Sequence, residues 1–287
     1  MASRFFDIVP IALQSSSNLD YIHSPLVSLE TAVQPVAHLI DNLSLNVNKA
    51  KQVWSILTPE NGLTTDEAAA IHLYTTETNS YRSIYRRLNE ALRLNISSYI
   101  LVWHLYLKLL RTGLEKIPSR KTTVWRGVRK DLSHQLYKGK RFTWLSVTSC
   151  SGSVNQIKNF LRGKGTIFTI DSVNGKPISS YSQFKSEDEV ILLPGTELVT
   201  VADPLDVNGV WIIHLRELAK TSNAYLKTTV LPLVQSAKSH KSAAPSPSPH
   251  HVLKFLILSK TPPGTPFGNS ITLPKITTKT SNVKNVT

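Results

Sequence analysis

The stretch SEDEVILLPGTELVTV, residues 186–201, contains two β-type runs on either side of Pro194-Gly195. The first run, DEVILLP, becomes almost entirely apolar after an acidic start, and the second, ELVTV, is rich in β-branched residues. Short runs of this kind, bounded by proline and glycine, are typical of β-strands. The stretch therefore predicts that this part of the chain is built from short strands.

The same pattern extends in both directions, from about residue 120 to residue 233. Three further β-rich runs precede the opening stretch and one follows it; they are TTVWRGV (122–128), FTWLSVTS (142–149), GTIFTI (165–170) and GVWIIHLREL (209–218). Gly163-Lys164-Gly165 and Val173-Asn174-Gly175 are turn signals between runs. We predict a β-rich part over residues 120–233.

Residues 25–119, in contrast, carry helical patterns. Thr64 with Glu67 three residues later is a capping-box signal for a helix that continues through AAAIHLYT. Apolar residues recur at helical spacing over Ser28–Ile40, but Pro35 lies inside this run, so we expect a kink or a split there. Further helices are predicted over Tyr81–Arg93 and Ser97–Glu115.

The two ends of the chain differ from the rest. Residues 1–24 form an N-terminal segment without a clear pattern, and residues 234–287 form a basic tail rich in Ser, Pro and Lys. From Ser236 to Thr287 there are seven lysines and no acidic residue, so half of the formal charge of +14 lies there. We predict that this tail is disordered, although its apolar run HVLKFLIL is also compatible with an edge strand or a docking peptide.

Composition limits the possible partners and compartments. The basic charge makes a nucleic-acid partner possible, but no zinc-finger spacing or aromatic RNA-binding motif supports one. No apolar run approaches the roughly 20 residues of a membrane helix, and Met1–Gln14 is a poor secretory signal, which argues against a secreted toxin-like protein. Cys150 is the single cysteine, so no internal disulfide forms. We expect a cytoplasmic or nuclear protein with no membrane association and no metal.

The acidic cluster Glu187-Asp188-Glu189 is the first candidate for chemistry. If the segment is extended, Glu187 and Glu189 point to one side and Asp188 to the other. Two carboxylates close together disfavour joint ionisation, which suits a division between stabilising a cation and moving a proton. For an isolated Glu-x-Glu, the plainer interpretation is a solvated acidic turn.

Two other clusters precede it in the β-rich part. Arg126-Gly127 lies in the run VWRGV, and Ser149-Cys150-Ser151 ends the run that begins at Phe142. A guanidinium suits binding of phosphate, and a hydroxyl can hold a neighbouring carboxylate in one rotamer. Taken singly, Arg126 is compatible with a surface arginine and Ser149 with a turn hydroxyl.

The order and spacing of the three clusters resemble the R-S-E class of arginine-specific NAD:protein mono-ADP-ribosyltransferases. VWRGV is similar to the family's Tyr-Arg-Gly strand, FTWLSVTSCS to its strand ending in Ser-Thr-Ser, and SEDEVILLPG to its Glu-x-Glu segment. LTTDEAAAIHLYT and YRRLNEALR resemble its Tyr-Thr and Asn-x-x-Leu-Arg helices, which belong to the eukaryotic branch. The resemblance covers roughly residues 25–218; Cys150 and Trp125 depart from the family pattern without removing its functional groups.

The resemblance implies the fold and the activity. The expected architecture is the α+β ADP-ribosyltransferase fold, in which an N-terminal helical region packs on two short, roughly perpendicular β-sheets. The implied activity is transfer of ADP-ribose from NAD to arginine side chains of an acceptor protein, with release of nicotinamide. NAD is the co-substrate, and the transition state is oxocarbenium-like, as in glycoside hydrolysis.

The resemblance also assigns the roles. Glu189 is the central catalytic residue beside the ribose, Ser149 holds Glu189, and Arg126 contacts the NAD phosphates and braces the site; Gly127 and Ser151 complete the NAD-binding set. Glu187 takes the proton from the acceptor guanidinium, and a glutamate there goes with arginine acceptors, whereas a glutamine goes with asparagine or cysteine. Tyr181 and Phe184 either pack on the acceptor guanidinium or anchor their loop.

Two alternatives remain open on the sequence alone. The same fold with water as acceptor is an NAD glycohydrolase, which Glu187 argues against. A non-catalytic nucleic-acid-binding module working through the basic tail predicts steeply salt-dependent binding that survives loss of both glutamates.

Overall fold

A computed structural model describes residues 20–77, 81–158 and 164–219. All of them belong to one compact unit, Met1–Leu226. The tail 234–287, including HVLKFLIL, and the expected turn residue Gly163 lie outside the described residues. Within them, the regular elements up to Lys116 are helices, and all strands follow that residue.

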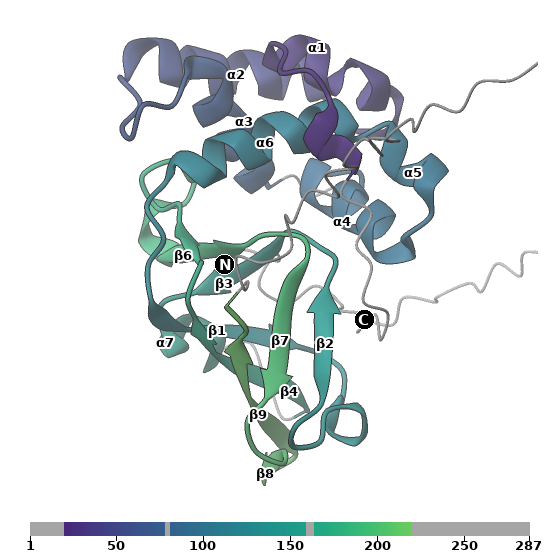
Figure 1. The fold of residues 1–287 in the computed structure, drawn as a ribbon. Helices are drawn as coiled ribbons and strands as arrows, with labels where there is room; N and C mark the ends of the chain where they lie inside the picture. Colours follow the sequence, from purple (N-terminus) through teal and green to yellow (C-terminus); the bar gives the residue numbers. More distant parts are fainter. Residues whose placement is uncertain (1–19, 78–80, 159–163, 220–287) are drawn as a thin grey trace, which may run out of the picture. The chain divides into compact units, whose positions relative to one another are not determined.

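The helical elements are η2 (Asp20–His23), α1 (Leu29–Val33), η3 (Gln34–Leu39), α2 (Leu43–Ile56), α3 (Thr65–Thr75), α4 (Ile84–Leu94), α5 (Ser97–Leu101), α6 (His104–Lys116), η4 (Ser133–Gln135), α7 (Val154–Lys158) and η5 (Lys185–Glu187). The strands are β1 (Thr122–Val128), β2 (Arg141–Trp144), β3 (Thr148–Ser151), β4 (Gly165–Ser172), β5 (Lys176–Pro177), β6 (Glu189–Leu192), β7 (Thr196–Thr200), β8 (Leu205–Val207) and β9 (Val210–Glu217). Figure 1 shows α1 to α6 gathered on one side of the strands, with α7 apart from them.

Two helix signals in the sequence are confirmed. Thr64 Oγ1 accepts a hydrogen bond from Glu67 N at 3.2 Å, and the Glu67 carboxylate accepts one from Thr64 N at 2.8 Å, which is the complete capping box of α3. The run Ser28–Ile40 splits as expected: α1 ends at Val33 and a 3-10 helix with Pro35 in its first turn follows. Proline lacks the N–H that a continuing α-helix needs.

Two other helix predictions need correction. The single helix expected over Ser97–Glu115 is two helices, α5 and α6, because the chain tightens at Trp103, whose N–H bonds Ile100 O at 2.9 Å. Helix α2 was not predicted, although its buried residues Leu43, Val47, Ala50 and Trp54 follow helical spacing.

The packed helical region also begins earlier than the predicted boundary at residue 25. Tyr21 is fully buried in the helical core, and Lys108 Nζ donates a hydrogen bond to Ile22 O at 2.8 Å. Residues from Asp20 onward therefore belong to the folded part.

Over the described residues, the strands form one nine-stranded mixed sheet. Its order is β2-β7-β9-β4-β1-β3-β6-β5, with β8 added on β9, and only β4 and β9 are parallel. β1 and β3 are joined through a single residue pair, Trp125 with Ser151. The two sheets expected from the family fold are therefore two halves of one sheet: β2, β7, β9, β4 and β1 form the first half, and β3, β6 and β5 form the second. Figure 1 shows β3 and β6 of the second half running across the direction of β2 and β7 of the first.

The run FTWLSVTS, predicted as one strand, is divided between the two halves. β2 pairs with β7, whereas β3 pairs with β1 and β6, so the chain changes neighbours over Leu145–Val147. At Val147 the side chain of Asn89 takes the place of a strand partner, accepting from Val147 N at 3.1 Å and donating to Val147 O at 3.0 Å. The break is therefore fixed by a helix residue that is distant in sequence.

Alternation along β3 and β6 separates two cores. Cys150, Val190 and Leu192 pack with residues of β1, β2, β4, β7 and β9, whereas Ile191 packs with Val147 and the helices. Between β6 and β7, Pro194-Gly195 forms a tight turn closed by Thr196 N to Leu193 O at 3.1 Å, with Gly195 at φ 85°. A glycine suits this positive φ, as in a type II turn. The helix-facing side of β3 and β6 carries the candidate site.

Candidate active site

Arg126 on β1 is a buried cation that binds the neighbouring strand. Its side chain is 4% exposed, and Nη1 donates a hydrogen bond of 2.6 Å to the backbone O of Ser149 on β3. A buried guanidinium has to satisfy its donors inside the protein. Gly127 beside it is also buried and pairs with Ile167 of β4. Arg126 therefore braces β1 against β3 at the residue next to Cys150.

The register of β3 and β6 brings the serines and the second glutamate together. Ser151 lies directly opposite Glu189, and Ser149 opposite Ile191. Residues that face each other on antiparallel strands project to the same side, so Ser149, Ser151 and Glu189 share one face. Glu189 is fully buried on that face, and Ser149 is 1% exposed.

The hydroxyl that hydrogen-bonds the Glu189 carboxylate comes from the loop before β6. Ser182 Oγ lies 3.3 Å from Glu189 Oε2, and Ile178 N donates to Glu189 O at 2.9 Å, which closes residues 178–189 into a loop on the strand end. Ser182 was not among the predicted site residues. The sequence offers no signal that separates it from the other serines of this loop, Ser179, Ser180 and Ser186.

Ser149 shares the face of Glu189, but its hydroxyl contacts a different group. Ser149 Oγ lies 3.4 Å from the hydroxyl of Tyr74 at the end of α3. Ser182 thus donates a hydrogen bond to Glu189 that was not predicted, and the hold of Ser149 on Glu189 stays a prediction.

The expected extended segment Glu187-Asp188-Glu189 is wrong. Glu187 ends the 3-10 turn η5, Asp188 has the left-handed conformation with φ 45°, and β6 begins only at Glu189. Ser151 Oγ donates to Glu187 O at 3.0 Å, and Gly152 N donates to Asp188 O at 2.8 Å. A turn held by β3, rather than strand alternation, thus brings both glutamates to the end of β3, and Glu187 is 6% exposed.

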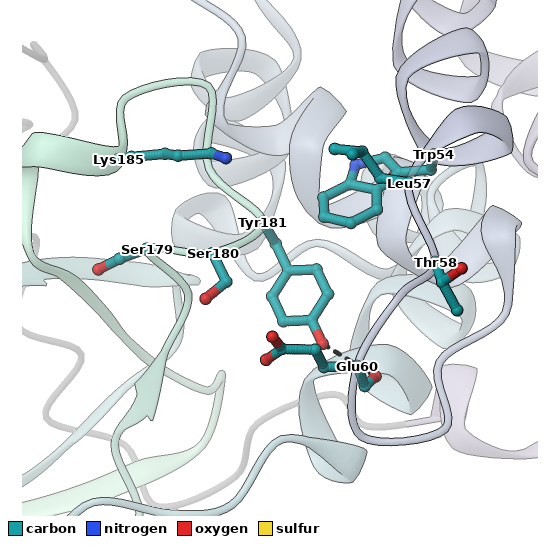
Figure 2. Close-up of a pocket in the computed structure, with 8 residues that line it drawn as sticks. All are labelled: Trp54, Leu57, Thr58, Glu60, Ser179, Ser180, Tyr181 and Lys185. Carbon is teal, nitrogen blue, oxygen red and sulfur yellow. Dashed lines mark hydrogen bonds between the residues drawn. The ribbon is translucent and has the colours of Figure 1, made fainter.

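Tyr181 has the contacts of a loop anchor. Its ring centroid lies 5.2 Å from that of Trp54, its hydroxyl donates to Glu60 O at 3.0 Å, and Asn61 Nδ2 lies 3.2 Å from the same oxygen. The side chain is only 2% exposed, and Figure 2 shows its ring directed toward α2 and the segment that follows it. This geometry favours the anchoring alternative for Tyr181 over contact with an acceptor.

The same loop borders a pocket of about 410 Å³. Its lining residues come from α2, from the segment after α2 and from the loop; they are Trp54, Leu57, Thr58, Glu60, Ser179, Ser180, Tyr181 and Lys185. Two further bonds fix the loop beside the pocket: Gln183 N to Thr75 Oγ1 at 2.9 Å and Phe184 N to Ser182 Oγ at 3.1 Å. Phe184 is half-buried, so the residue is partly accessible from outside.

Cys150 lies between the two site serines but faces the opposite core. It is fully buried, and burial raises the pKa of its thiol to about 12. A thiol with this pKa is protonated at neutral pH and is a poor nucleophile. Among the described residues, no cluster of three or more His, Cys, Asp or Glu side chains offers a metal site.

Comparison with solved structures identifies the fold. The ADP-ribosyltransferase HopU1 of Pseudomonas syringae pv. Tomato DC3000 matches with a TM-score of 0.51 and 21% identity, over 60% of this chain and 87% of that protein. The architecture described above is thus that of an ADP-ribosyltransferase.

Comparison of sequences identifies the family. The model of the NAD:arginine ADP-ribosyltransferase family matches residues 28–223, and the chain belongs to this family. NAD(P)(+)--arginine ADP-ribosyltransferase 2 of Gallus gallus is 30% identical over 177 residues, which cover 59% of this chain. The chain spans about half the length of this curated relative, 54%. No helix in the described part of the chain has the length and apolar character needed to span a membrane.

Proposed function

We propose that this protein transfers ADP-ribose from NAD to arginine side chains of an acceptor protein and releases nicotinamide. Membership of the family supports the reaction class. The observation that carries the proposal is the placement of a fully buried carboxylate, Glu189, opposite Ser151 and next to the strand that Arg126 braces. Arg126, Ser149 and Glu189 are far apart in sequence, and their order along the chain is that of the R-S-E motif.

Glu189 is the proposed catalytic carboxylate. NAD supplies an ADP-ribosyl group when its bond to nicotinamide breaks, and positive charge then develops on the ribose. A carboxylate held in a water-poor site stabilises that charge more strongly than it would in water. The hydrogen bond from Ser182 keeps the carboxylate in one orientation, so little reorganisation is needed during the reaction.

The NAD-binding set comprises Arg126, Gly127, Ser149, Ser151 and Glu189. Its donors and acceptors fit a dinucleotide, because a guanidinium suits phosphate and hydroxyl groups suit ribose. The bond from Arg126 to Ser149 O supports the bracing role for this arginine beside its proposed contact with phosphate.

Glu187 is the proposed base for the acceptor. A guanidinium is protonated at neutral pH, so it becomes a nucleophile only when a base takes its proton as the new bond forms. Glu187 lies at the end of the loop and two residues from Glu189, which supports action on the acceptor rather than on the ribose. Phe184, which is partly accessible, is the proposed apolar contact for the acceptor side chain.

The experiment that tests the proposal measures three products from one reaction. The full chain is incubated with NAD, with and without agmatine as a guanidinium acceptor, and nicotinamide, ADP-ribosyl-agmatine and free ADP-ribose are quantified. We expect nicotinamide and ADP-ribosyl-agmatine to appear in similar amounts. Free ADP-ribose alone would establish a glycohydrolase instead, and the absence of all three products would remove the proposed function.

The close approach of Gly152 to Asp188 gives a prediction about the turn between the two glutamates. A Cβ at position 152 would lie 1.9 Å from Asp188 Oδ2 and 2.7 Å from its Cγ. Gly152→Ala therefore has to displace the Asp188 carboxylate, which is the end of a half-exposed side chain and can rotate away from the new Cβ. Because the backbone of the turn can keep its position, we expect nicotinamide release to fall by only a few-fold in the NAD assay.

Removal of the Asp188 side chain should abolish this small effect. Asp188→Gly removes the carboxylate that the new Cβ meets, and glycine tolerates the left-handed backbone at φ 45°. The double variant Gly152→Ala/Asp188→Gly should recover the nicotinamide release rate of Asp188→Gly alone. A double variant as slow as Gly152→Ala would place the defect elsewhere than in this contact.

A further inference from the structure

Tyr74 at the C-terminal end of α3 reaches from the helical region into the candidate active site. Its side chain is 1% exposed, and its hydroxyl lies 3.1 Å from Val147 O and 3.4 Å from Ser149 Oγ. The hydroxyl thus touches both the residue before β3 and the site serine on β3.

Asn89 on α4 forms a hydrogen bond to the same Tyr74 hydroxyl. It is 4% exposed, and besides its two bonds to the backbone of Val147, its Nδ2 lies 3.4 Å from the Tyr74 hydroxyl. The orientation of the amide follows from its partners, because Val147 N–H needs an acceptor and Val147 O needs a donor. Two helices therefore meet the start of β3 through one buried polar network.

The protons in this network can be assigned from the chemistry of its members. Val147 O is a carbonyl and can only accept, so the single proton of the Tyr74 hydroxyl points to it. The Asn89 amide nitrogen can only donate, so it binds a lone pair of the Tyr74 oxygen. The remaining lone pair of Tyr74 faces Ser149, whose hydroxyl is therefore the donor in this contact.

We propose that Tyr74 is a positioning residue that orients the hydroxyl of Ser149, with Asn89 holding Tyr74 and the start of β3 in place. The inference rests on the proposed function, because the part that Ser149 plays in NAD turnover comes from it. With its proton directed to Tyr74, Ser149 presents lone pairs to the face that it shares with Glu189. A ribose hydroxyl is a donor that fits such lone pairs.

Tyr74→Phe is a suitable test because it removes one oxygen and little else. Val147 O keeps its bond from Asn89, so the start of β3 retains its support. Asn89→Ala is less suitable, since it leaves both backbone groups of Val147 without their side-chain partner in a buried place. Loss of one neutral hydrogen bond corresponds to a rate decrease of about three- to tenfold, which we expect for nicotinamide release and for transfer to agmatine alike.

Tyr106→Phe is the matched control. The Tyr106 hydroxyl is also buried and donates to a backbone carbonyl, Ala70 O, at 3.0 Å, but it belongs to α6 and, within the described residues, makes no hydrogen bond to β3. Both variants should lower the thermal midpoint of unfolding, Tyr74→Phe by more because its hydroxyl has three partners and that of Tyr106 has one. Only Tyr74→Phe should lower turnover.

A double-mutant cycle with Ser149→Ala separates positioning from a general structural role. If Tyr74 acts through the Ser149 hydroxyl, Tyr74→Phe has no further effect on turnover in the Ser149→Ala background. If the two effects multiply, or if Tyr106→Phe lowers turnover as much as Tyr74→Phe, the inference is overturned. Wild-type protein is assayed first. If it does not turn over NAD, both this inference and the proposed function are removed. If it does, but the effects of Tyr74→Phe and Ser149→Ala multiply, this inference alone is removed.

Discussion

Replacement of Glu189 by glutamine should reduce nicotinamide release and transfer to agmatine together, by roughly 1000-fold. Glutamine has nearly the same shape, and its amide oxygen can still accept the hydrogen bond from Ser182, which lies 3.3 Å from the carboxylate. What the variant loses is the negative charge beside the ribose. Because breakage of the nicotinamide bond is common to transfer and hydrolysis, both products should fall by the same factor in a single assay.

Glu67→Gln is the control for the loss of a buried negative charge outside the candidate site. Glu67 is also fully buried, accepts the capping hydrogen bond of α3 and pairs with Lys116 at 2.6 Å, in the helical core rather than at the site. We expect it to lose stability and keep full turnover per folded molecule. If Glu189→Gln retained more than about a tenth of wild-type turnover, the charge of Glu189 would not be the main source of catalysis.

The strand positions of the proposed site residues could be predicted from the sequence because each residue lies in or beside a β-type run. Arg126, Ser149 and Glu189 each lie in a β-rich run, and the pairing of two such runs brings Ser151 opposite Glu189. Local signals also predicted the start of α3 at Thr64, since a capping box depends on residues only three positions apart.

The features that were missed depend on partners distant in sequence. The break in FTWLSVTS arises at Val147, whose backbone binds Asn89, 58 residues away. The hydroxyl on Glu189 comes from Ser182 because the loop folds back on the strand end, and nothing local distinguishes this serine from its neighbours. The turn at Asp188 has a similar origin, since Gly152, directly after β3, donates a backbone hydrogen bond to Asp188 O. Sequence patterns describe periodicity within a segment, whereas these contacts are fixed by packing between segments.

Replacement of Glu187 by glutamine should separate the two halves of the reaction. The amide cannot take a proton from a guanidinium, so transfer to agmatine should fall by roughly 100-fold or more, the contribution typical of a general base. Nicotinamide release should change only a few-fold, because Glu189 and its bond from Ser182 are unaffected. Free ADP-ribose should therefore become the main product, measured beside ADP-ribosyl-agmatine in the same reaction.

Asp188→Asn is the matched control for this variant. It removes a carboxylate charge one residue away, and asparagine tolerates the left-handed backbone that Asp188 adopts. The product ratio of this control should equal that of the wild type, since Asp188 has no proposed part in either step. A parallel loss of release and transfer in Glu187→Gln would instead mean that Glu187 acts in bond breakage. The turn that holds Glu187 at the end of β3 would then position this carboxylate for breakage of the nicotinamide bond rather than for proton transfer from the acceptor.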